Sequence, residues 1–271
     1  MTRCLYLDLD GTLLGRGASM LHDGQGEVTL LGVRAVEACL RAGVEVVLMS
    51  GRRRAQVHED ARLLSGSSTF IFESGACLVL DGEEFWMTEP WMPDEQTIHE
   101  QVAAGGAPEL LLTEYAGRLE YHDPWHTSRE VTHLFRGLVD AEEVDRLLAE
   151  RGHGELRLVD NGTVHAPTSR LTGLSHLRGY HLLPRGASKA RAAARHMRAR
   201  GYAREEVFAV GDSREDLDCV AVVGRLWLVA NALERDPSMA EAIAGRENVS
   251  VTEAGNGPGV YEAVVATLVS R

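Results

Sequence analysis

Hydrophobic and polar residues alternate in two patterns that recur near both ends of the chain. Short, almost wholly apolar runs predict buried strands at 4–9, 44–49, 69–72, 207–210, 226–230 and 249–252. Stretches with apolar residues at helical spacing predict intervening helices, including 29–42, 55–64 and 189–200. Strands that alternate with helices predict an α/β fold, a doubly wound, mostly parallel sheet with right-handed crossovers.

The middle third of the chain has a different pattern. Paired runs around turn residues predict hairpins at 76–80 with 83–88, 110–115 with 118–122, and 156–160 with 163–166. Helices are predicted at 94–104 and at 140–151, the second with Asp140 as N-cap. We therefore expect a core domain built from 1–84 and 183–271, with an α+β domain, 85–182, inserted in it.

Composition and charge narrow the possible partners. The formal net charge of −12 argues against a nucleic acid or an anionic membrane, but not against a small phosphorylated substrate. No apolar run is long enough to span a membrane, and we identify no signal peptide. The four cysteines form no C-x-x-C pair, which argues against zinc and predicts buried thiols in the cytoplasm.

Polar side chains follow several of the predicted strands. Asp8 with Asp10, then Ser50, Glu73 and Asp212 stand at or just after strand ends. Ligands of doubly wound sheets bind beyond the carboxyl ends of the strands, so we expect these groups to share one crevice. Two neighbouring carboxylates repel each other unless a cation lies between them, and Mg²⁺ suits such oxygen ligands.

Each acidic segment also has a simpler interpretation. Asp10-Gly11 is typical of a turn, and Asp212-Ser213 is typical of a helix N-cap. The shared placement at strand ends favours a site over both. A further observation supports a site, because Lys189 is the single lysine among 28 basic residues and opens a predicted helix. The chain otherwise uses arginine for positive charge, so the lysine indicates a position that needs a compact ammonium group.

These residues resemble the four motifs of the haloacid dehalogenase (HAD) superfamily of phosphatases. The motifs correspond, in order, to Asp8-Leu9-Asp10-Gly11-Thr12, Ser50-Gly51-Arg52, Lys189 and Gly211-Asp212-Ser213-Arg214-Glu215-Asp216. The insertion after the third strand resembles the branch with a large α/β cap, which includes Cof-like, sucrose-phosphate and mannosyl-3-phosphoglycerate phosphatases. The resemblance implies a Rossmann-like core, an inserted cap and a phosphoric monoester hydrolase.

The resemblance also implies a role for each motif residue. Asp8 would be the nucleophile and Asp10 the general acid and base. Magnesium would be held by Asp8, the Asp10 carbonyl and Asp212, with Asp216 binding directly or through water. The phosphate would be bound by Leu9, Ser50, Gly51 and Lys189, and Lys189 would also act in catalysis by neutralising charge on the nucleophile.

Two positions depart from the family pattern. Glu215 replaces an asparagine that contacts phosphate, and we expect it to turn outward or to stand near the metal. Ser74 replaces the usual asparagine of Asn-Gly-Ala. Arg52 is expected either to bind substrate or to face solvent. In the inserted domain, Arg129 and Arg136 are candidates for recognising the leaving group, although we favour a surface loop with a packed tryptophan as the explanation of their segment.

The leading hypothesis is a magnesium-dependent phosphatase acting on a sugar phosphate or a glycosyl phosphoglycerate through an aspartyl-phosphate. A phosphomutase would use the same core with a second phosphate site. A non-catalytic regulator that binds sugar phosphates, with Glu215 as the mark of a degraded site, is the alternative outside the enzymes.

Overall fold

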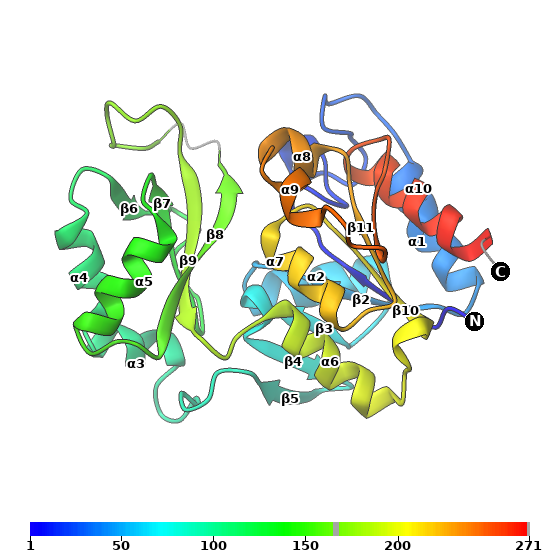
Figure 1. The fold of residues 1–271 in the computed structure, drawn as a ribbon. Coiled ribbons are helices and arrows are strands. Elements are labelled where there is room, and N and C mark those ends of the chain that lie inside the picture. The colour runs from blue at the N-terminus through cyan, green and yellow to red at the C-terminus, as the bar shows by residue number, and fades with distance from the viewer. Residues whose placement is uncertain (165–167, 270–271) are drawn as a thin grey trace. The chain divides into compact units, whose positions relative to one another are not determined.

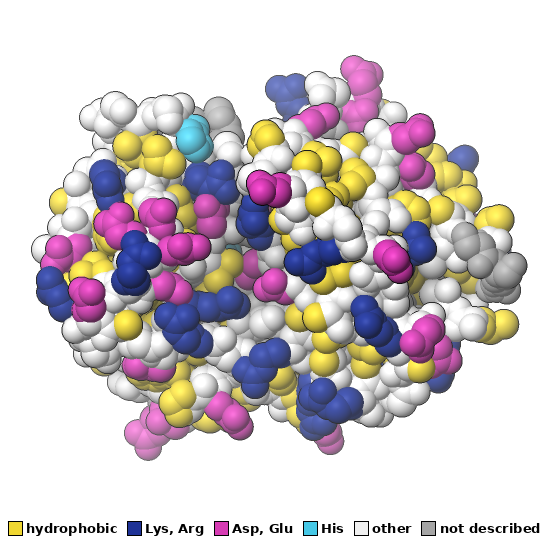
Figure 2. Space-filling model, viewed as in Figure 1, with side chains coloured by type: hydrophobic (Ala, Val, Ile, Leu, Met, Phe, Trp, Pro, Cys, Tyr) yellow, Lys and Arg dark blue, Asp and Glu magenta, His cyan; other side chains and the backbone are white. Residues whose placement is uncertain are grey.

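The computed structural model describes residues 1–164 and 168–269 and divides into two compact units (Figure 1). The first comprises Met1–Phe85 and Lys189–Arg271, and the second Trp86–Ser188. No helix among the described residues is both long and apolar enough to cross a membrane. Figure 2 shows acidic and basic side chains interspersed on the face in view. Ion pairs within one unit include that of Arg178 with Asp160 at 2.6 Å.

The first unit is built on an eight-stranded sheet in the order β12-β11-β10-β1-β2-β3-β4-β5. The strands are β1 (Cys4–Leu7), β2 (Glu45–Met49), β3 (Phe70–Phe72), β4 (Cys77–Leu80), β5 (Glu83–Trp86), β10 (Val207–Gly211), β11 (Arg225–Leu228) and β12 (Val249–Val251). The strands from β12 to β3 pair in parallel, and β4 is antiparallel to β3. The predicted fold class is confirmed, including the hairpin that forms the antiparallel edge.

Helices connect these strands. They are α1 (Leu31–Arg41), α2 (Arg54–Leu64), α6 (Lys189–Arg200), α7 (Arg214–Leu217), α8 (Asn231–Arg235), α9 (Met239–Ile243) and α10 (Asn256–Val269). Helices α1 and α10 come from distant parts of the chain and lie side by side (Figure 1). Single 3₁₀ turns at Arg16–Ala18, Glu73–Gly75, Arg204–Glu206 and Asp218–Ala221 complete the connections.

Strands β1 and β10 form the centre of this sheet. Every residue of both strands is buried, which explains why their sequences are continuously apolar rather than alternating. The pairing continues one residue beyond β1, where the Asp8 amide donates to the Val210 carbonyl at 3.1 Å. The chain segments that begin at Asp8 and at Asp212 therefore leave the sheet side by side, at the carboxyl ends of their strands.

In the residues that the structure describes, the second unit is a four-stranded antiparallel sheet with three helices. The sheet has the order β6-β7-β9-β8, with β6 (Leu119–Tyr121), β7 (His133–Gly137), β8 (Leu156–Thr163) and β9 (Arg178–Pro184). The helices are α3 (Ile98–Ala104), α4 (Ala107–Glu114) and α5 (Ala141–Glu150). The predicted helix N-cap is confirmed: Asp140 precedes α5, and its carboxylate accepts a hydrogen bond from the Glu143 amide at 2.9 Å.

Two of the predicted hairpins in this unit are wrong. The apolar run at 110–115 lies in α4, which follows the left-handed Gly106 and has Pro108 in its first turn, so the chain is already committed to a helix there. Asn161-Gly162 does not form a turn between strands, because it lies in β8 at an irregularity in the pairing with β9. The predicted return strand also reaches residue 166, which lies outside the described residues.

Candidate active site

Asp8 and Lys189 meet in the interior of the first unit. Lys189, the first residue of α6, places its Nζ 2.7 Å from Oδ1 of Asp8. Both side chains are buried, with the ammonium side chain 3% and the carboxylate side chain 7% exposed. The third and first of the family-like motifs, 181 residues apart in the chain, are thereby in direct contact.

Asp216 uses both of its oxygens. Oδ1 accepts a second hydrogen bond from Lys189 Nζ, at 2.7 Å, and Oδ2 accepts from the amide of Asp212 at 3.1 Å and from the Ser213 hydroxyl at 2.7 Å. Ser213 is the N-cap of α7 and also receives the Asp216 amide, which completes a capping box. The N-cap interpretation is therefore correct for this segment, and it coexists with the site.

Asp212 lies beside the turn that follows Asp8. Its Oδ1 accepts from the buried hydroxyl of Thr12 at 3.0 Å, and its Oδ2 accepts from Nη1 of Arg235 at 2.6 Å. Gly11, at φ +88°, must be glycine on two grounds: a Cβ there would collide with Asp212 Oδ2 at 2.3 Å, and the backbone is left-handed. The contact with Arg235 was not predicted from the sequence.

The Gly11 carbonyl is fixed by two asparagines. Asn231 and Asn256 donate their side-chain amides to it at 2.8 Å and 3.0 Å, and Asn256 also donates to the Leu14 carbonyl at 3.0 Å. Asn231 is the first residue of α8, and Asn256 is the first residue of α10. Their amide groups hold the turn after Asp10 in place.

Asp10 points to a different partner. Arg52 donates through Nε and Nη2 to its two carboxylate oxygens, each at 2.6 Å, and through Nη1 to Asp60 at 2.9 Å. Arg52 is neither free in solvent nor directed only at a ligand, because its side chain is 18% exposed and its guanidinium is shared by two acids. Asp10 itself is 52% exposed.

Glu215 does not turn outward. It is buried, at 6% exposure, and accepts a hydrogen bond from the Ser74 hydroxyl at 3.2 Å. Of the two expected placements, the outward-facing one is wrong, because the short helix α7 directs this position into the protein beside Lys189. Glu215 contributes to the electrostatic stabilisation of the ammonium. The two departures from the family pattern, Ser74 and Glu215, are thus in contact with each other.

The candidate phosphate-binding residues lie at the ends of β1 and β2. Ser50 is 1% exposed, and its hydroxyl accepts from the Arg52 amide at 3.2 Å. The Ser74 amide donates to the Ser50 carbonyl at 3.1 Å, which ties this turn to the end of β3. Leu9 is fully buried, and its carbonyl accepts from the amides of Thr12 and Leu14. Gly51 lies between Ser50 and Arg52, and is half-buried.

Burial and charge act on these groups in opposite directions. Burial alone would lower the pKa of Lys189, but the carboxylates of Asp216 and Asp8 raise it above its usual value, so the ammonium keeps its proton. Burial raises the pKa of Asp8, against the pull of Lys189. Burial also raises the pKa of Asp212 to about 6, although Arg235 opposes the shift. Both acids would bind a further cation favourably.

The three buried acids suit a magnesium ion. Oxygens of Asp8, Asp212 and Asp216 all lie within 4.8 Å of one another. Mg²⁺ prefers oxygen ligands from a few carboxylates and keeps some of its waters. The donor set therefore fits the predicted metal.

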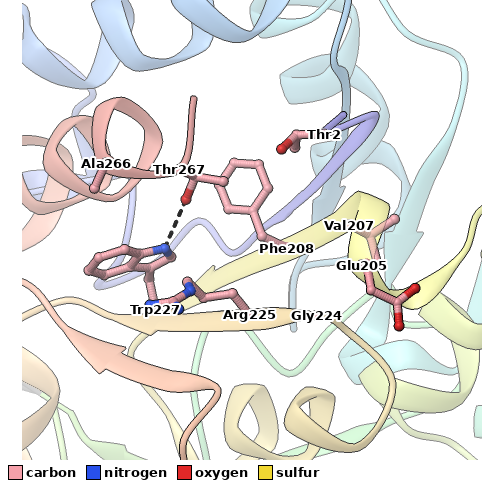
Figure 3. A pocket seen from close by; sticks show the side chains of 9 residues that line it. All are labelled: Thr2, Glu205, Val207, Phe208, Gly224, Arg225, Trp227, Ala266 and Thr267. Atoms are coloured by element: carbon pink, nitrogen blue, oxygen red, sulfur yellow. Dashed lines mark hydrogen bonds between the residues drawn. The ribbon is translucent and has the colours of Figure 1, made fainter. Parts of the chain in front are cut away.

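A separate hollow of about 400 Å³ lies at the amino ends of β10 and β11 (Figure 3). Trp227 closes one side of it by donating its Nε1 to the Thr267 hydroxyl at 2.9 Å. None of the predicted site residues lines it, since those lie at the carboxyl ends of the strands.

The arginines expected to recognise a leaving group are held within the second unit. Arg136, 3% exposed, donates to Glu120 at 2.6 Å and to the carbonyls of Asp123 and Thr168. Arg129, also buried, donates to the Trp125 carbonyl and to the Thr132 hydroxyl. These contacts order the loops around them.

Comparison with known proteins gives a consistent result. The chain is 26% identical to a phosphoglycolate phosphatase from Archaeoglobus fulgidus over 264 residues, which cover 97% of this chain and 95% of that protein. No family profile matches the chain. Among solved structures, the sucrose-phosphatase of Synechocystis has a TM-score of 0.66 at 14% identity, covering 98% of each chain. A haloacid dehalogenase-like hydrolase from Bacteroides thetaiotaomicron has a TM-score of 0.62 at 17% identity, covering 98% and 99%.

The fold is therefore that of the haloacid dehalogenase-like hydrolases. The curated relatives that match along almost the whole chain are phosphatases, and the enzyme class of this chain is accordingly that of the phosphoric monoester hydrolases. The predicted resemblance to the haloacid dehalogenase-like hydrolases and the predicted enzyme class are confirmed.

Proposed function

We propose that this protein is a magnesium-dependent phosphatase that hydrolyses a small phosphate monoester through an aspartyl-phosphate on Asp8. The contact that carries the proposal is the buried pair of Asp8 and Lys189, in which a carboxylate and an ammonium lie 2.7 Å apart among further acids. An ion pair that served only to stabilise the surface would have no reason to be buried in this way. A nucleophile that must approach an anionic phosphoryl group does need compensating positive charge.

In the proposed reaction, an oxygen of Asp8 attacks phosphorus while the bond to the leaving oxygen breaks. Asp10 gives its proton to that oxygen, then takes a proton from the water that attacks the aspartyl-phosphate, so inorganic phosphate is released and Asp8 is restored. Lys189 neutralises charge on Asp8 and on the phosphate. Ser50 and the amides of Leu9 and Gly51 hold the phosphate oxygens.

Magnesium would be held by Asp8, Asp212 and the Asp10 carbonyl. When bound, it offsets the repulsion between the nucleophilic carboxylate and the phosphate. Asp216 would bind the metal directly or through water. Its oxygens also accept hydrogen bonds from Lys189 and Ser213, so it would help to position Lys189 and the Asp212 segment.

The substrate class we propose is a small phosphorylated metabolite. One curated relative is a phosphoglycolate phosphatase, and one structural neighbour is a sucrose-phosphatase. We therefore add phosphorylated carboxylates to the candidate substrates expected from the sequence, which are sugar phosphates and glycosyl phosphoglycerates. We place the reaction in the cytoplasm, where the four free, buried thiols would stay reduced.

The test is release of inorganic phosphate from phosphoglycolate, hexose monophosphates, a glycosyl phosphoglycerate and nucleotides, with Mg²⁺ and with a chelator. We expect turnover only with Mg²⁺, and its loss by at least about a thousandfold in Asp8→Asn. Asp94→Asn, an exposed aspartate of the second unit, is the matched control. Unchanged turnover in Asp8→Asn would remove the nucleophile assignment. Transfer of phosphate to a sugar hydroxyl would instead identify a phosphomutase, and no turnover of any ester would favour a binding protein.

A further inference from the structure

Arg235 contacts a proposed metal ligand. It is the last residue of α8, and its Nη1 lies 2.6 Å from Oδ2 of Asp212. The arginine side chain is 47% exposed, whereas the carboxylate is 7% exposed. The arginine side chain therefore extends from the surface to a carboxylate that is itself buried. Of the two oxygens of Asp212, Thr12 occupies one and Arg235 the other.

This contact sits directly on the turn after Asp10. A Cβ on Gly11 would lie 2.2 Å from Arg235 Nη1 and 2.3 Å from Asp212 Oδ2, so both groups pack against the backbone of that glycine. The adjoining Asp10 carbonyl is the backbone oxygen proposed for magnesium. A positive charge therefore already stands beside two of the proposed metal ligands.

The surroundings allow the arginine to leave while the turn stays in place. The Gly11 carbonyl is held by the side-chain amides of Asn231 and Asn256, and neither hydrogen bond involves Arg235. A hollow of about 370 Å³ in the same unit is lined in part by Arg235, Gln25 and Pro258. The long side chain of arginine can turn into such a space by rotation about its own bonds.

We propose that Arg235 is a built-in counter-ion that competes with the divalent cation for Asp212 and thereby lowers the affinity of the site for Mg²⁺. The proposal rests on the magnesium site of the proposed function. Two cations that share one carboxylate repel each other, so Mg²⁺ must displace the guanidinium or bind beside it. Without the metal, Arg235 compensates a carboxylate that would otherwise be buried without its partner.

The experiment is calorimetric titration of the full chain with Mg²⁺ alone, without substrate. We expect Arg235→Gln to bind Mg²⁺ about tenfold more tightly than the unsubstituted protein, and Arg235→Lys, which keeps the charge, to bind with nearly unchanged affinity. Arg214→Gln is the matched control. Arg214 is also 47% exposed and also ion-paired, but its partner is Asp236.

A second measurement separates competition from a purely structural role. Without metal, Arg235→Gln should unfold at a lower urea concentration, and saturating Mg²⁺ should stabilise it more than it stabilises the unsubstituted protein. Equal or weaker Mg²⁺ binding by Arg235→Gln would overturn the inference while leaving the metal site intact. Absence of Mg²⁺ binding by every one of these proteins would overturn the magnesium site itself, and the inference with it.

Discussion

Arg52 holds Asp10 through both carboxylate oxygens, with Nε and Nη2 each 2.6 Å from an oxygen. This is the paired geometry in which a guanidinium binds a carboxylate most strongly. Because Nη1 is also bonded to Asp60 of α2, the guanidinium is anchored to a helix. In this arrangement Asp10 is oriented as a carboxylate, which suits the proposed role as base; to act as acid it must exchange one of these hydrogen bonds for a proton.

We predict that Arg52→Lys lowers kcat by about tenfold or more. Lysine keeps the positive charge but cannot reproduce the two parallel hydrogen bonds that orient Asp10. Steady-state kinetics with an aryl phosphate would measure the effect, and KM should change less than kcat. Asp60→Asn, which removes the other partner of Arg52, is the control and should keep most of the activity. A kcat in Arg52→Lys equal to that of the unsubstituted protein would show that the pairing has no catalytic role.

Lys189 gives a prediction for stability. Replacing it with methionine leaves the carboxylates of Asp8 and Asp216 buried without their shared cation. We expect Lys189→Met to lower the free energy of unfolding by about 3 kcal/mol, the loss typical of a broken buried ion pair. Urea denaturation of the metal-free protein would measure it.

A double substitution tests the cause. In an Asp8→Asn background one of the two charges is already absent, so Lys189→Met should cost clearly less than it does in the unsubstituted protein. Equal costs in the two backgrounds would mean that the loss comes from packing around the lysine stem. The comparison needs no assay of activity.

The second unit should lose stability in mild acid. His133 is buried, its ring is stacked on His99 at 3.7 Å, and its Nε2 lies 3.0 Å from the His99 carbonyl. Burial, together with the neighbouring His99, lowers the pKa of His133 from 6.5 to about 3. Below pH 6.5 the imidazole of His133 is therefore protonated in the unfolded chain but stays neutral in the folded chain. The free energy of unfolding consequently falls as the pH falls from 6.5 toward 3. The loss from this residue at pH 5 should be about 2 kcal/mol.

Fluorescence can report on this unit by itself. In a Trp227→Phe background the remaining tryptophans, Trp86, Trp91 and Trp125, all belong to the second unit. In this background we expect His133→Gln to reduce the difference in unfolding free energy between pH 7 and pH 5, measured in urea. His176→Gln, at an exposed position, should leave the difference unchanged. An undiminished difference in His133→Gln would assign the acid sensitivity to other groups.

The core was predictable because its signals agree at several levels. The runs that became β1 and β10 are continuously apolar, which suits strands buried on both faces. In the second unit the signals conflict. Leu110 to Leu112 is an apolar run too short to separate helix from strand, and the helix is decided by Gly106 and Pro108 before it. Strands β7 and β9 were missed because they pair across long separations in the chain.

The site was predictable in its acids and its lysine, since strand ends and helix starts determine where they fall. Its arginine contacts were not predictable. The pairing of Arg235 with Asp212 joins residues from two different strand–helix connections, and one sequence contains no signal for it. Arg52 was recognised as a candidate, but its partner Asp10 depends on the direction of a long, flexible side chain.

The hydrogen bond between Ser74 and Glu215 has a consequence for how these two positions can vary. Read along the sequence, these positions are two separate departures from the family pattern, 141 residues apart. In three dimensions they meet, because the hydroxyl of Ser74 donates to the carboxylate of Glu215. Changing either residue alone would remove this buried hydrogen bond, so the two positions should tolerate substitution together better than singly.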